Sequence, residues 1–113
     1  MKRIYIAGPY SADNVMDILK NIREGIRVST EVMKMGYSPF CPWLDYHFVL
    51  MDFGDKLKVE DFYRYSLDWL AVSDAVIVIG EWLKSKGTIK EIEFARKNNI
   101  PIYWGFYDFE KSN

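Results

Sequence analysis

Residues 85–91, which read Ser-Lys-Gly-Thr-Ile-Lys-Glu, combine small residues with a carboxylate in a way that could support chemistry. Ser85 and Gly87 open a predicted helix, and Glu91 follows one turn into it. Backbone N–H groups and the helix dipole favour an anion at such a point, phosphate included. Thr88-x-x-Glu91 also has the spacing of a capping box, and spacing alone favours that structural role. Ser85 and Gly87 likewise fit ordinary turn chemistry.

The other chemically capable side chains stand alone in the sequence. Cys41 and His47 are the single cysteine and the single histidine, so the chain can form neither an internal disulfide nor a structural zinc site, and we expect no metal. One cysteine fits a reducing compartment, which predicts a cytoplasmic location. Cys41 is expected to be a buried small residue, and His47 a hydrogen-bonded loop histidine. Tyr5 and Tyr10 fit core or rim packing by default.

Hydrophobic periodicity and turn residues predict an alternation of strands and helices. Strands are expected at residues 2–7, 37–41, 74–80 and 100–104. Helices are expected at residues 14–35, at 58–72, and from Gly87 or Thr88 to about 98–99. Residues 43–57 follow neither period and are predicted to form a long loop, a feature that is often functional. The pattern predicts a Rossmann-like α/β three-layer sandwich with a parallel sheet of four or five strands.

Length and charge exclude several classes of protein. A chain of 113 residues is expected to form one domain over 1–113. With 15 Lys+Arg, 16 Asp+Glu and a net charge of −1, it lacks the basic stripe that binds polymeric nucleic acid. The longest apolar run, residues 75–79, is far shorter than the roughly 18 residues of a membrane span. Walker A, GxGxxG and GxSxG motifs are absent, which removes the usual support for kinases, dinucleotide oxidoreductases and serine hydrolases.

Ligands of parallel sheets bind at the carboxyl ends of the strands. That rule points to the loop at residues 8–11, the segment 43–57 and residues 80–91.

Motifs in these segments and beside them occur in a recognisable order. They are Ile-Tyr-Ile-Ala-Gly-Pro-Tyr at 4–10, Tyr-Ser-Pro-Phe at 37–40, Trp-Leu at 69–70, Ser-Asp-Ala-Val at 73–76, and Ser85-x-Gly87-x-x-x-Glu91-x-x-x-Ala95. The ordered set resembles the nucleoside 2-deoxyribosyltransferase superfamily. That superfamily includes deoxynucleoside-monophosphate N-glycosidases and small phage and bacterial members of unassigned function. The resemblance covers residues 4 to about 104.

The resemblance implies a role for each matching residue. Glu91 matches the family glutamate that attacks the anomeric carbon of the sugar, and Tyr5 matches the strand-one tyrosine beside it. The loop beneath the substrate corresponds to Gly8, Pro9 and Tyr10. Ser85, with Gly87 behind it, matches a position that is serine in the nucleotide glycosidases and aspartate in the nucleoside transferases, which favours a phosphorylated substrate.

The implied function is cleavage or transfer of the N-glycosidic bond of a small-molecule nucleoside, deoxynucleoside or 5′-monophosphate. No cofactor is implied. A carboxylate below the anomeric carbon suits this reaction because the transition state resembles an oxocarbenium ion. A homo-oligomer is also expected, both from the family and from the 17% aromatic content.

The sequence departs from the family at the residue that assists the leaving base. The family aspartate, eight residues before Asp74, is replaced by Ser66. The nearest carboxylate, Asp68, should point away unless the helix register differs, because two residues along a helix turn it by about 200°. Either another residue such as Asp45 or His47 takes this role, or the chain is a nucleotide-binding module that turns over slowly or not at all. A pure protein-interaction domain that uses its Trp and Tyr surface is a third, weaker alternative.

Overall fold

The computed structural model describes residues 2–113. Its four strands are β1 (Arg3–Ala7), β2 (Ser38–Phe40), β3 (Ala75–Val78) and β4 (Ile102–Trp104). They form one parallel sheet in the order β2-β1-β3-β4. The helices are α1 (Val15–Lys34), α2 (Tyr46–Asp52), α3 (Val59–Ala71), α4 (Lys86–Lys97) and α5 (Phe106–Ser112), with short 3-10 turns η1 (Pro42–Asp45) and η2 (Trp82–Lys84). The predicted α/β class is confirmed, with four strands.

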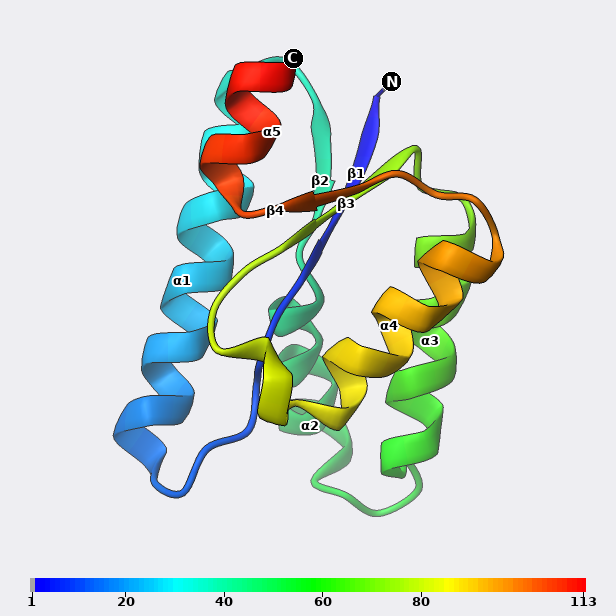
Figure 1. The fold of residues 1–113 in the computed structure, drawn as a ribbon. Helices are drawn as coiled ribbons and strands as arrows, with labels where there is room; N and C mark the ends of the chain where they lie inside the picture. The colour runs from blue at the N-terminus through cyan, green and yellow to red at the C-terminus, as the bar shows by residue number, and fades with distance from the viewer. Residues whose placement is uncertain (1) are drawn as a thin grey trace.

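Helices cover both faces of the sheet, α1 and α5 on one and α3 and α4 on the other (Figure 1). The alternation of β1 decides which side chains face each layer, because successive residues of a strand point to opposite faces. Ile4 and Ile6 enter the core beneath α1 and α5. Tyr5 and Ala7 enter the core beneath α3 and α4. Tyr5 therefore points toward the helix that carries Glu91.

Helix α1 matches its predicted range closely. The side chain of Asn14 accepts a hydrogen bond of 2.9 Å from the Asp17 N–H and satisfies a free donor of the first turn. Beyond the helix, Gly36 has φ of +93°, in the region that favours glycine.

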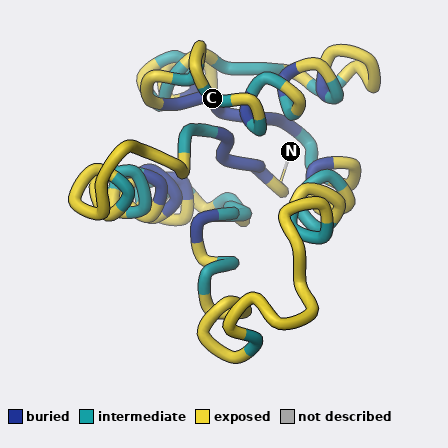
Figure 2. Tube along the Cα trace, turned by 90° about the horizontal axis from the view of Figure 1, so that it is seen from below, coloured by how far each residue is buried: buried dark blue, intermediate teal, exposed yellow. Residues whose placement is uncertain are grey.

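The predicted loop at residues 43–57 is wrong over most of its length, because η1 and α2 occupy residues 42–52. Helix α2 carries four apolar residues in succession, Phe48 to Met51, all of them exposed, so its sequence shows no apolar stripe of helical period. Only residues 53–58, all exposed, connect α2 to α3 without helical structure (Figure 2).

Two further elements differ from expectation. Helix α4 begins at Lys86, slightly before the predicted start at Gly87 or Thr88. Helix α5, which was not expected, is short, and Phe109 is its one buried residue. Within residues 2–113, no helix has the length and apolar character that crossing a membrane requires.

Candidate active site

A cavity of about 990 Å³ opens beside the carboxyl ends of β1 and β3. These neighbouring strands connect to β2 and β4 in opposite directions, which makes their carboxyl ends the switch point where ligands bind in such sheets. Seven of the residues predicted for the site line the cavity: Gly8, Pro9, Tyr10, Ser66, Ser85, Gly87 and Glu91. Tyr5 lies fully buried beside it and is joined to it through Glu91.

The Tyr5 hydroxyl donates a hydrogen bond to the Glu91 carboxylate. Strand β1 directs Tyr5 toward α4, whose buried stripe consists of Thr88, Ile92 and Ala95. Glu91 lies on that same sheet-facing side, since residues three and four apart share one face of a helix. A carboxylate in this position is unusual, because charged side chains normally occupy the solvent-facing side.

Glu91 does not cap α4, so the capping-box interpretation of Thr88-x-x-Glu91 is wrong. The N-cap is Ser85, whose hydroxyl accepts from the Thr88 N–H at 3.3 Å and lies 2.8 Å from the Thr88 hydroxyl. This cap starts the helix earlier than expected and moves Glu91 into the second turn, beyond reach of the free N–H groups of the first.

Burial dominates the electrostatics of the Tyr5–Glu91 pair. Loss of solvent raises the pKa of Glu91 to about 7; the Tyr5 hydrogen bond lowers it, and the charge of Asp45 raises it further. Burial also raises the pKa of Tyr5 well above its usual value, with the Glu91 charge as the next cause. Tyr5 thus stays a neutral donor, and Glu91 changes charge near neutral pH.

Ser66, where the sequence departs from the nucleoside 2-deoxyribosyltransferase pattern, lies close to Tyr5 and Glu91. Ser66 lines the cavity from α3, and its hydrogen bond to the Tyr5 hydroxyl lowers the pKa of that tyrosine. Asp68 is exposed and lies outside the cavity lining.

Asp45, at the end of η1, is another carboxylate in the cavity wall, which also carries Asp13, Asp17 and Glu81. It is half-buried, and burial raises its pKa to about 6. His47 lies outside the lining; it is exposed on α2, not in a loop, and its Nδ1 is 2.8 Å from the Leu44 carbonyl oxygen. Cys41, expected to be buried, is only partly so.

Trp43 holds the loop after β1 in place, a role that was not predicted from the sequence. Its indole Nε1 donates to the Pro9 carbonyl at 3.0 Å, and the side chain is almost fully buried. The ring packs where Gly25 of α1 leaves space, since a Cβ there would overlap the indole. Gly8 is needed for a similar reason, because its Cβ would lie 2.9 Å from the Ile79 carbonyl oxygen. A glycine inside an otherwise regular helix was the available signal.

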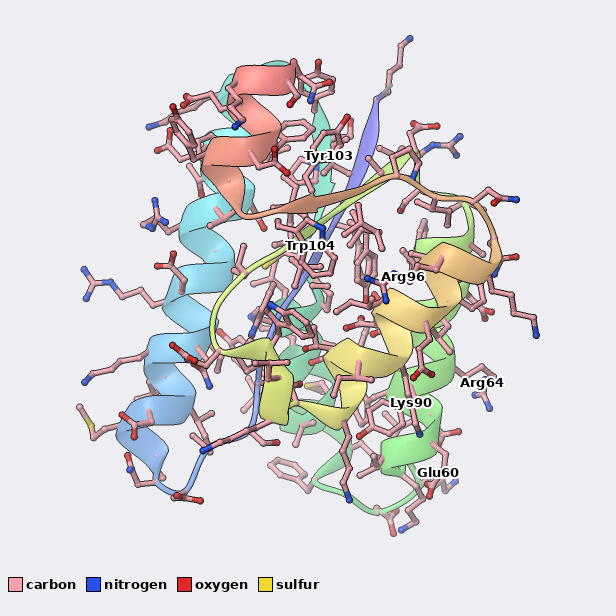
Figure 3. All side chains as sticks on the ribbon, viewed as in Figure 1. Glu60, Arg64, Lys90, Arg96, Tyr103 and Trp104 are labelled. Carbon is pink, nitrogen blue, oxygen red and sulfur yellow. The ribbon has the colours of Figure 1, made fainter. Side chains whose placement is uncertain are left out.

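Lysines surround the start of α4, and Lys84, Lys86 and Lys90 all line the cavity. Lys90 lies over the ring of Tyr63, 4.9 Å from its centroid, between α4 and α3 (Figure 3). These cations and the free N–H groups of the first helical turn make this end of the cavity favourable for an anion. Across residues 2–113, no three metal-ligating side chains come together.

Comparison with known proteins places the chain in a family. It belongs to the family described as Domain of unknown function (DUF7768), whose model matches residues 2–104. The curated proteins include no match to it.

Among solved structures, it resembles one described as the characterization of a 2-deoxyribosyltransferase from the psychrotolerant bacterium Bacillus psychrosaccharolyticus. The TM-score is 0.62 at 17% identity, and the match covers 89% of this chain and 69% of the other. At this identity the likeness establishes a shared fold.

Proposed function

We propose that this protein cleaves or transfers the N-glycosidic bond of a nucleoside, a deoxynucleoside or the corresponding 5′-monophosphate. The observation that carries the proposal is the Tyr5–Glu91 pair at the cavity wall. No capping or ion-pairing role explains Glu91, whereas a nucleophile needs a carboxylate that is held in place and poorly solvated.

In the proposed reaction, Glu91 attacks the anomeric carbon as the bond to the base breaks. The carboxylate stabilises the positive charge that develops on the sugar, and it forms a covalent glycosyl-enzyme. Tyr5 orients the carboxylate through its hydrogen bond. Water then completes a hydrolysis, and a second base completes a transfer.

The test is incubation with the common nucleosides and their 5′-monophosphates, followed by chromatography for released base. Glu91→Gln is expected to abolish release while ligand binding survives, because the Gln side chain keeps the shape and loses the charge. Glu93→Gln is the matched control, since Glu93 is an exposed glutamate on the same helix. Equal activity of both variants would refute the role of Glu91.

The lysines near Ser85 favour a phosphorylated substrate. Ser85 is neutral, and Lys84 and Lys86 flank it at the start of α4. Phosphate binds well where cations and free backbone N–H groups converge. Calorimetry on Glu91→Gln is therefore expected to give tighter binding for a 5′-monophosphate than for its nucleoside. Equal affinities would contradict a phosphate subsite.

A non-catalytic nucleotide-binding module is the second candidate function. Ser66 favours it, because the position that carries the family aspartate has no ionisable group. An intact protein that binds nucleotides by calorimetry and releases no base from any of them would support this alternative.

A further inference from the structure

We propose that Asp45 is the acid that protonates the leaving base in this protein. The inference rests on the proposed glycosidic function and supplies the group that Ser66 cannot. It would move the acid from α3 to the η1 turn, on a different wall of the same cavity.

Three observations carry this assignment. Asp45 lines the cavity together with Glu91, and the charge of Asp45 acts on Glu91, Tyr5 and Tyr10. Within residues 2–113 its carboxylate makes no hydrogen bond or ion pair, so its oxygens are available to a ligand. It begins α2 without capping it, since no side-chain bond to the first turn forms.

The position of Asp45 is held firmly although its carboxylate is free. Trp43, two residues earlier, is anchored by its hydrogen bond to Pro9 and by its packing against Gly25. The turn that carries Asp45 is therefore fixed to the loop after β1, which forms another wall of the cavity. A general acid needs such positioning, because the proton must be within hydrogen-bonding distance of the base.

Asp13, Asp17 and Glu81 also line the cavity, but all three are exposed to solvent, whereas Asp45 is partly buried. Asp68 is exposed and outside the lining, and the His47 ring faces the Leu44 carbonyl oxygen. The lysines at the start of α4 lie at the end of the cavity that favours an anion.

The reaction starts from the minor form of the pair in which Glu91 is ionised and Asp45 holds the proton, since burial raises the pKa of Glu91 to about 7 and that of Asp45 to about 6. The Glu91 oxygen bonds to the anomeric carbon, the bond from that carbon to the base nitrogen breaks with its electron pair on the base, and the Asp45 proton moves to the base. In the second half, water attacks the anomeric carbon and gives a proton to the Asp45 carboxylate. Glu91 then leaves as a carboxylate, and both groups return to their starting states.

The experiment compares two kinds of leaving base in Asp45→Asn. One substrate is the ordinary nucleotide that releases base in the panel described above. The other is 7-methyl-2′-deoxyguanosine 5′-monophosphate, whose base already carries a positive charge and leaves without a proton. We expect Asp45→Asn to slow release of the ordinary base by about 100-fold or more, the usual scale of general acid catalysis. Release of 7-methylguanine should change by less than about threefold, because no proton transfer limits it.

Controls separate a chemical role from a structural one. Asp68→Asn should match the wild type on both substrates, and Asp45→Glu should recover part of the lost rate. Equal slowing of both substrates by Asp45→Asn would overturn the proposal, as would no slowing of either. Cleavage of the ordinary substrate but not of the methylated one by the wild type would also overturn it. If the wild type releases no base from any substrate, the proposed function itself fails, and the acid role fails with it.

Discussion

Replacing Glu91 by Gln should make the fold more stable at alkaline pH, contrary to the usual effect of altering a hydrogen-bonded residue. Folding raises the pKa of Glu91 from 4.5 to about 7, so between these values the folded state retains a proton that the unfolded chain has released. Stability therefore falls as pH rises from about 4.5 to about 7, and above that the loss amounts to about 3 kcal/mol.

The variant escapes this loss because glutamine cannot ionise. Its amide oxygen still accepts from Tyr5, and the change from a charged to a neutral hydrogen bond needs no separate correction, because the raised pKa of Glu91 already includes the bond to Tyr5. The expectation at pH 8 is therefore a gain of about 3 kcal/mol, or roughly 12 °C in melting temperature for a domain of this size. At pH 4 both side chains are neutral, and the two proteins should melt at nearly the same temperature.

Calorimetric melting of wild type and Glu91→Gln at pH 4 and pH 8 measures this difference directly. Glu93→Gln, on the exposed side of α4, should shift the melting temperature little at either pH. A Glu91→Gln protein that is less stable than wild type at pH 8 would refute the reasoning, because it would show that the carboxylate stabilises the fold. Stability given up at one partly buried carboxylate is typical of a functional group.

Tyr5→Phe should lower the rate of base release by about 10-fold or more, since a hydrogen bond to a charged group is worth roughly 1.5–3 kcal/mol. It should also move the rising limb of the pH–rate profile to higher pH, because that bond lowers the pKa of Glu91. An unchanged profile would contradict the orienting role. Gly25→Ala should destabilise the protein by about 1–3 kcal/mol in denaturant titrations through overlap with Trp43, although alanine normally favours a helix; a more stable variant would refute this. Light scattering should show a homo-oligomer. Phe53→Lys should shift the protein toward monomer, because Phe53 is 83% exposed at the end of α2, which has no buried residue. A wild type that is only monomeric at micromolar concentration would disprove this prediction.

Local sequence patterns were sufficient for the elements that bury one regular face. Strand β3 is continuously apolar, α1 has a clear amphipathic stripe with Asn14 and Gly36 at its ends, and alternating strands and helices predict a parallel sheet. The carboxyl-end rule then indicated the segments that line the cavity. Helix α2 escaped prediction because its seven residues place four apolar side chains in succession, which gives no helical period to detect.

The character of individual side chains required the tertiary structure. Glu91 has the spacing of a capping residue, and only the start of α4 at Lys86 and the position of Tyr5 on β1 show that it is not one. Asp45 is an ordinary acidic residue in the sequence; burial by segments distant in the chain raises its pKa and leaves its carboxylate free. Solvation and charge depend on all neighbours in space, whereas periodicity depends on neighbours in sequence. For that reason the sequence by itself determined the sheet, and the packing of the layers decided the chemistry of its cavity.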